Sequence, residues 1–136
     1  MTTIEEIMTK DVLAVNPDAQ ISIAVKIFVI RKITGLPVID ANRNLLGIIT
    51  EKDLMHLLIK NEKNEEKIVA DFMTKDVKYF APEDNVIDVC TVLLENPFRT
   101  IPIVNDGKLV GIVSRSDMIK LLWEEIQNKQ NMYTQT

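Results

Sequence analysis

Apolar and polar positions follow each other along the chain in an order that predicts a mixed α/β unit. Residues 12–15 form a short β-prone run, and the Asn-Pro-Asp that follows is a turn signal. From Ile21 to Phe28 the apolar residues fall at helical spacing. Two further apolar runs, 36–40 and 45–50, predict strands that pair antiparallel, and residues 54–58 begin a closing helix. The first half is therefore expected to read strand, helix, strand, strand, helix.

The same order returns in the second half of the chain. Met8-Thr9-Lys10-Asp11-Val12 recurs as Met73-Thr74-Lys75-Asp76-Val77, so that position 8 corresponds to position 73, an offset of 65. Gly47-Ile48-Ile49-Thr50 recurs as Gly111-Ile112-Val113-Ser114, from position 47 to position 111, an offset of 64. One residue is missing from the second copy, in the turn between its second and third strands, where length changes are tolerated.

The repeat divides the chain into two similar units and two polar segments. The first unit is expected at 1–60, a mixed-charge linker at 61–67, the second unit at 68–126, and a polar tail that frays at 127–136. Short helices are expected to lead the units, at 3–8 and 68–73. Units of this size bury too little surface to be stable alone. We therefore expect an α+β protein in which two β-α-β-β-α units pack together about a pseudo-twofold axis.

Composition narrows the class of protein. The net charge of −4, from 16 basic and 20 acidic residues, weighs against a nucleic-acid partner. No apolar run is long enough to span a membrane, and the acidic N-terminus does not resemble a signal peptide, so a cytoplasmic location is expected. The single cysteine, Cys90, excludes an internal disulfide and is expected in the core.

Two equivalent tetrapeptides stand where a strand passes into a helix. They are Thr50-Glu51-Lys52-Asp53 and Ser114-Arg115-Ser116-Asp117. One interpretation is a capping box, in which the hydroxyl and the acid pair with backbone N–H groups of the first helical turn. A functional interpretation uses the same geometry, because a helix N-terminus attracts anions and a short acid there can accept hydrogen bonds from two ribose hydroxyls.

Four other residues have a positional meaning in this pattern. Gly47 and Gly111 interrupt strand patterns, which indicates either close approach of a ligand or tight packing between the copies. Asn85 is well placed as a helix N-cap, whereas its counterpart Gln20 is a poorer one.

A catalytic or metal-binding constellation is not found. His56 is the only histidine, so it has no histidine partner for a metal site or a base–nucleophile pair. The sequence contains no Walker loop, dinucleotide fingerprint, zinc spacing or nucleophile elbow. We therefore expect a protein that is not an enzyme and that needs no metal and no cofactor.

The repeated Met-Thr-Lys-Asp-Val, the Leu-Pro-Val-Ile-like strand and Gly-Ile-Ile-Thr-Glu-Lys-Asp together resemble a tandem pair of cystathionine-β-synthase (CBS) domains, the Bateman module. The resemblance extends from about Ile4 to Leu122. It implies two clefts between the units that bind adenosyl ligands such as AMP, ADP, ATP or S-adenosylmethionine.

The resemblance also implies which residues form each cleft. Asp53 and Asp117 would hold ribose, and Thr50 and Ser114 would approach ribose or phosphate. Each cleft would be built from both copies. The first would combine Asp117 with backbone near Lys10 to Val12 and Thr34 to Leu36. The second would combine Asp53 with backbone near Lys75 to Val77 and Thr100 to Pro102.

The resemblance places a phosphate contact at Arg99, whose counterpart in the first copy is Thr34. With Arg115 as a second candidate for phosphate, we expect the Asp117 cleft to bind an adenine nucleotide better than the Asp53 cleft. Arginine suits a bidentate contact with phosphate.

The function that follows is a regulatory module that senses an adenosyl ligand and modulates a partner protein, which the sequence does not name. The alternative is a structural dimerisation module with empty clefts. Apolar residues beyond the core stripe of the closing helices indicate a partner surface, and a homodimer is expected in either case. These residues are Met55, Ile59, Ile119 and Trp123.

Overall fold

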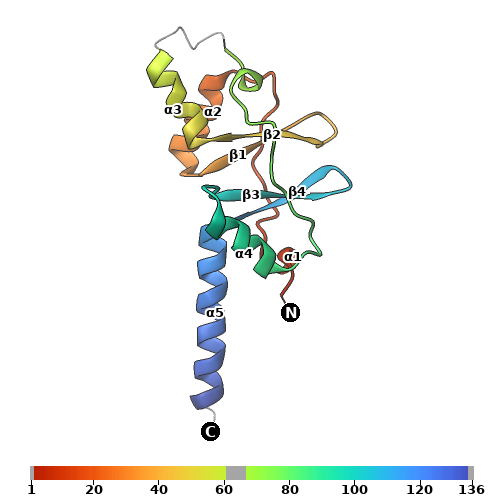
Figure 1. The fold of residues 1–136 in the computed structure, drawn as a ribbon, viewed down its shortest axis with the longest axis vertical. Coiled ribbons are helices and arrows are strands. Elements are labelled where there is room, and N and C mark those ends of the chain that lie inside the picture. Colours follow the sequence, from red (N-terminus) through yellow and green to blue (C-terminus); the bar gives the residue numbers. More distant parts are fainter. Residues whose placement is uncertain (1, 61–66, 135–136) are drawn as a thin grey trace.

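Two antiparallel hairpins form the centre of the molecule. The computed structural model describes residues 2–60 and 67–134, so most of the predicted linker and the last two residues lie outside the described part. Strand β1 (Gly35–Ile39) pairs with β2 (Leu45–Thr50), and β3 (Thr100–Asn105) pairs with β4 (Lys108–Ser114). The hairpins lie next to each other (Figure 1).

Helices complete each repeat as the pattern predicts. Helices α2 (Ile21–Arg31) and α3 (Glu51–Lys60) flank the first hairpin, and α4 (Val86–Glu95) and α5 (Arg115–Thr134) flank the second. The two repeats thus contain the same elements in the same order. The predicted α+β fold of two tandem units is confirmed.

The register of the hairpins locates the missing residue. Ile39 pairs with Leu45, and the equivalent Val104 pairs with Leu109, so the copies lose their common offset between these positions. The second hairpin closes with Asp106-Gly107, both at positive φ, a two-residue turn that suits the twist of antiparallel strands. The prediction that the deletion lies in this turn is confirmed.

The predicted first strand of each repeat shrinks to a single bridge. Val15 forms a parallel bridge with Val38, and the equivalent Phe80 forms one with Ile103. Each is followed within two residues by a proline, Pro17 or Pro82. Proline fixes φ and has no N–H to donate, so the pairing cannot extend past the bridge toward the helix. Residues 12–14, which precede the first bridge, form no bridge with the hairpin.

The leading segment of each repeat packs against the other repeat. Helix α1 (Ile4–Ile7) places Ile4 in the core of the second repeat, beside Val89 and Ile101. The 3₁₀ helix η2 (Val69–Asp71) places Val69 in the core of the first repeat. The predicted leading helices therefore exist, although they are shorter than expected and are exchanged between the repeats.

Extended residues continue this exchange beside the glycines. Thr9 bridges Ile112 on β4, and Thr74 bridges Ile48 on β2. A Cβ atom on Gly47 would lie 2.7 Å from the Thr74 carbonyl oxygen, and one on Gly111 would lie 3.0 Å from that of Thr9. Of the two interpretations of these glycines, tight packing between the copies is confirmed.

The helix ends follow the predictions for caps. The Asn85 side chain accepts a hydrogen bond from the Ile87 backbone N–H at 2.9 Å and so caps α4. Among the described residues, the Gln20 side chain makes no such bond at the start of α2.

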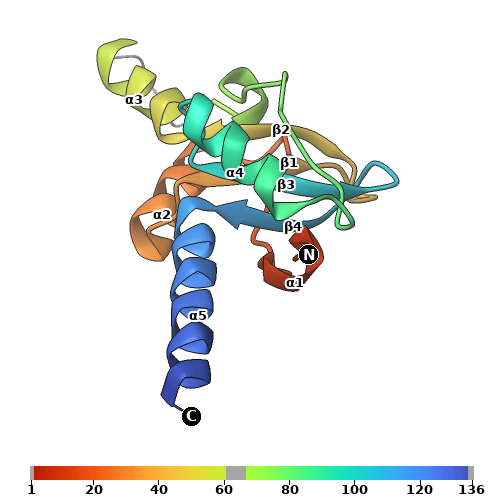
Figure 2. The same ribbon diagram turned by 60° about the horizontal axis from the view of Figure 1, so that its bottom comes forward.

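Helix α5 is longer than predicted. It runs to Thr134 and extends away from the body of the protein (Figure 2). Residues 127–134, predicted as a polar tail, continue this helix, since positions 115–134 contain neither glycine nor proline and several good helix formers. Within residues 2–60 and 67–134, no helix is both long and apolar enough to cross a membrane.

Candidate functional site: a cleft between the repeats

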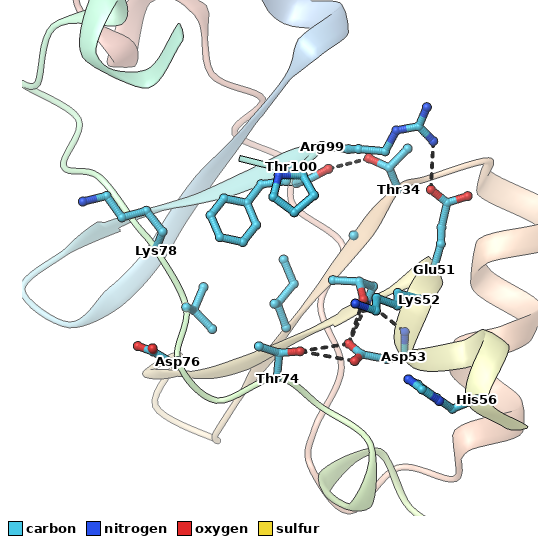
Figure 3. A pocket seen from close by; sticks show the side chains of 16 residues that line it. Thr34, Glu51, Lys52, Asp53, His56, Thr74, Asp76, Lys78, Arg99 and Thr100 are labelled. Carbon is cyan, nitrogen blue, oxygen red and sulfur yellow. Dashed lines mark hydrogen bonds and ion pairs between the residues drawn. The ribbon is translucent and has the colours of Figure 1, made fainter. Parts of the chain in front are cut away.

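A cavity of about 470 Å³ opens between the two repeats (Figure 3). Its walls come from the start of α3, from the segment 74–78 that leads the second repeat, and from residues 97–100 before and at the start of β3. The volume lies within the range of about 300–1,000 Å³ that is usual for small-molecule sites. Two segments of the second repeat thus enclose the acidic helix start of the first.

Asp53 is fixed in this cleft by a complete capping box. Its Oδ2 accepts hydrogen bonds from the Thr50 backbone N–H and hydroxyl, both at 2.9 Å, and its backbone N–H donates to Thr50 Oγ1 at 3.2 Å. The Thr74 hydroxyl lies 3.2 Å from both carboxylate oxygens of Asp53. The capping interpretation is confirmed, and the carboxylate still faces a hydroxyl that comes from the other repeat (Figure 3).

Two further side-chain contacts join the repeats at the cleft. The Thr34 and Thr100 hydroxyls share a hydrogen bond of 2.6 Å. An Arg99 guanidinium nitrogen lies 3.0 Å from the Glu51 carboxylate, an ion pair between the residue before β3 and the first residue of α3. Figure 3 shows this pair on the same side of the cleft as Thr34.

Apolar and charged side chains divide the rest of the lining. Ile48, Val77, Pro97 and Phe98 provide an apolar surface. The charged lining residues balance, because three are basic and three are acidic, and the imidazole ring of His56 adds a polar edge. The charged residues are Lys52, Lys78, Arg99, Glu51, Asp53 and Asp76.

Asp117, which closes the equivalent turn with Ser114, stands beside a smaller cavity. Asp117 Oδ2 accepts hydrogen bonds from the Ser114 backbone N–H at 2.8 Å and from its hydroxyl at 3.1 Å. The adjacent cavity is about 180 Å³, and its lining includes Glu6, Asp117 and Glu124 with only Lys120 as a basic residue. This surrounding is less suited to an anionic ligand than the Asp53 cleft.

The expectation that Arg99 and Arg115 favour the Asp117 side is wrong. Arg99 lines the Asp53 cleft, because it precedes β3 and reaches across to α3 of the first repeat. Arg115 donates hydrogen bonds to the carbonyl oxygens of Leu93 and Asn96 at the end of α4. Thr34, expected beside Asp117, also lines the Asp53 cleft.

Apart from Ser114, Arg115 and Asp117, the residues of the sequence-predicted site divide into three groups. The structure brings together six of them in the Asp53 cleft: Thr34, Thr50, Asp53, Val77, Arg99 and Thr100. Leu36 and Pro102 are buried within their strands. Lys10, Val12 and Lys75 line neither of the two cavities described above.

Sequence reasoning missed several residues of the cleft. Thr74 belongs to the repeated Met-Thr-Lys-Asp-Val motif, and that repetition was a usable signal for it. Asp76 lies within the segment Lys75 to Val77 that the resemblance implied, but its side chain was not singled out. Glu51 stood inside a motif already singled out. Phe98 lines the cleft because of the path that the chain takes before β3, and no sequence pattern predicts that path.

Comparison with known proteins identifies both repeats. The CBS domain family model matches residues 4–60 and 69–124. The protein MJ1225 of Methanocaldococcus jannaschii is 33% identical over 119 residues, which are 88% of this chain and 42% of that protein. The chain therefore spans less than half the length of this relative.

Solved structures agree with this match in fold. The structure of CBSX2 from Arabidopsis thaliana in complex with AMP has a TM-score of 0.82 and 33% identity, covering 91% of this chain and 98% of that one. The CBS domain pair of protein MJ0100, solved with 5′-methylthioadenosine and S-adenosylmethionine, has a TM-score of 0.81 and 27% identity, covering 92% and 98%. With both repeats matched along nearly their whole length, this chain belongs to the CBS domain family, as a tandem pair.

Proposed function

We propose that this chain is a regulatory module that binds an adenosyl ligand in the Asp53 cleft and passes its occupancy on to a partner protein. The observation that carries the proposal is the Asp53 carboxylate, fixed at a helix N-terminus in a cavity that both repeats build. The likeness to structures solved with AMP and with S-adenosylmethionine supports the choice of ligand class. The proposed role includes no catalytic step.

The chemistry of the cleft fits the three parts of an adenine nucleotide. Asp53 can accept hydrogen bonds from ribose hydroxyls once the Thr74 hydroxyl has moved away from its carboxylate. Phe98 and the aliphatic lining offer an apolar slot for the base, since aromatic rings favour stacking. Arg99 lies at the side of the cleft beside Glu51, where a phosphate would meet a planar donor.

Titration calorimetry on the purified chain tests this proposal. AMP, ADP, ATP and S-adenosylmethionine are titrated in turn, and native mass spectrometry looks for a nucleotide that purifies with the protein. We expect at least one of these compounds to bind with a one-to-one stoichiometry. Absence of binding by all of them at millimolar concentration would contradict the proposal.

A second candidate function, dimerisation without a ligand, rests on the exposed apolar side chains of the outer helices. Leu58 on α3 and Leu94 on α4 are 85% and 81% exposed. Met55, Ile59, Ile119 and Trp123 are also exposed, as predicted. Apolar surface of this kind is typical of partner sites. We propose a homodimer that covers part of it.

Light scattering distinguishes the two assembly states. A dimer has twice the mass of the 15.5 kDa chain. A monomer at micromolar concentration would contradict the dimer. A dimer that binds none of the adenosyl compounds would favour the purely structural role.

A further inference from the structure

The cation best placed for a phosphate in the Asp53 cleft already has an internal partner. Arg99 from the second repeat and Glu51 from the first are joined by an ion pair of 3.0 Å at the edge of the cleft. Their side chains are 57% and 48% exposed, so neither is locked by burial. A phosphate that approaches Arg99 therefore meets a carboxylate on the same guanidinium group.

The charge of this carboxylate brings the lining of the cleft to neutrality. Basic and acidic lining residues are equal in number, three of each, with Glu51 among the acidic ones. Figure 3 shows Lys78 and Asp76 on the side away from Arg99 and Glu51. Without the charge of Glu51, the lining would carry one net positive charge.

We propose that Glu51 is an internal competitor for the phosphate of the ligand and so sets the preference of the cleft between phosphorylated and uncharged adenosyl compounds. The inference rests on the proposed function and deepens it. When a phosphate binds Arg99, the Glu51 side chain leaves the guanidinium and turns toward solvent. An uncharged nucleoside binds with the ion pair intact.

The other repeat supports a specific role for this pair. The position equivalent to Glu51 is Arg115, and the position equivalent to Arg99 is Thr34. Arg115 holds carbonyl oxygens at the end of α4, and the Thr34 hydroxyl is bonded to Thr100. The pair is thus a property of one cleft and not of the repeated fold.

The strength of the competition is modest. An ion pair between exposed side chains changes an equilibrium by at most about fivefold. Like charges held near each other cost a similar amount. Glu51→Gln should therefore tighten AMP binding by about twofold to tenfold and leave adenosine binding within about twofold. The gain should shrink as salt is added, because the interacting groups are exposed.

Calorimetry with AMP and adenosine on four proteins tests the proposal: wild type, Glu51→Gln, Arg99→Gln and the double variant. We expect Arg99→Gln to weaken AMP about tenfold, since a hydrogen-bonded charge is removed. The Glu51→Gln gain should be smaller in the Arg99→Gln background, as a double-mutant cycle shows for coupled groups. Glu125→Gln is the matched control, because it changes the same charge on the exposed face of α5.

The outcomes separate this proposal from the proposed function. If AMP and adenosine both bind but Glu51→Gln shifts neither, or shifts both equally, the competitor role is overturned and the ligand assignment stands. If Glu125→Gln matches the effect of Glu51→Gln, the effect is one of net charge and the competitor role is again overturned. If neither compound binds the wild type, the competitor role is overturned, and the adenosyl assignment is then decided by the titrations with ADP, ATP and S-adenosylmethionine.

Discussion

The acids that close the two capping boxes occupy different surroundings. Asp53 faces a cavity of about 470 Å³ that Arg99 also lines, whereas Asp117 stands beside one of about 180 Å³. The Thr74 hydroxyl reaches Asp53 from the other repeat. The two positions are equivalent in sequence but not in the chemistry they offer a ligand.

Replacing each acid by alanine should therefore have unequal effects on ligand affinity. We expect Asp53→Ala to weaken AMP binding by about tenfold to a hundredfold, because it removes a charged acceptor worth roughly 1.5–3 kcal/mol per hydrogen bond. Asp117→Ala should change it by less than about threefold. Each variant also loses the hydrogen bonds that its acid accepts from Thr50 or Ser114, at a cost of about 1 kcal/mol of stability. Affinity from calorimetry is therefore the measurement, and the opposite order would contradict the cleft assignment.

Gly47 is a second residue whose role can be tested alone. Its added Cβ in Gly47→Ala would lie 2.7 Å from the Thr74 carbonyl oxygen and 2.9 Å from Met73 Sδ. The backbone oxygen cannot move without breaking the bridge between Thr74 and Ile48. We expect the free energy of unfolding to fall by about 1–3 kcal/mol, the usual cost of overpacking.

Urea denaturation measures this loss, and Gly35→Ala is the control. The nearest atoms to a Cβ on Gly35 lie at 3.1 and 3.2 Å and belong to side chains. The control should therefore lose less stability. An unchanged midpoint for Gly47→Ala would show that the leading segment does not pack as described.

The hydrogen-bonding roles of these residues could be predicted from the sequence, but which residues lie together in one cleft could be predicted only in part. The capping boxes and the acids at helix starts could be predicted because both depend on residues three positions apart. The cleft to which Arg99 belongs could not, because it depends on how the chain before β3 passes the first repeat. The same holds for Phe98, which has no local signature.

At the scale of the elements, the N-termini of α2 and α4 are equivalent in the two repeats and allow a direct test of side-chain capping. Asn85 caps α4 through a side-chain hydrogen bond of 2.9 Å, and Gln20 occupies the equivalent position of α2. Asn85→Ala should lower the free energy of unfolding by about 1 kcal/mol. Gln20→Ala should change it by only a few tenths of a kcal/mol. Thermal and urea unfolding measure both, and equal losses would argue against the cap as the cause.

The elements themselves were largely accessible from the sequence. The hairpins and the main helices follow from apolar periodicity, and the single-residue deletion from the change in offset. The first strands were over-predicted, because the pattern of 12–15 does not reveal that only Val15 meets a partner. Helix α5 was predicted to end near Ile126, because the residues that follow are polar, but it runs to Thr134.

On the scale of the whole molecule, the exchange of leading segments makes the two repeats interdependent. Ile4 is fully buried in the core of the second repeat, and Val69 is fully buried in that of the first. We expect the separate halves, 1–60 and 61–136, to be unfolded alone, because each lacks a core residue whose loss alone costs about 2–5 kcal/mol. Circular dichroism of each half and of their mixture measures this.

Comparison of each half alone with the mixture of both halves tests the exchange of leading segments. Recovery of helical signal and of cooperative melting only when both halves are present would match the exchange. A half that melts cooperatively by itself would contradict it. In the intact chain, Ile4→Ala should destabilise as much as a substitution deep in the core, although Ile4 stands near the end of the sequence.

The exchanged leading segments also bear on the order in which the protein can fold as it leaves the ribosome. Ile4 and Thr9 are synthesised long before their partners Asp84 and Ile112, which belong to the second repeat. Contacts so distant in sequence slow folding, because the loop must close before they contribute. Until the second repeat has been made, the Ile4 side chain has no core to enter and stays exposed, and exposed apolar side chains of this kind make nascent chains prone to aggregation.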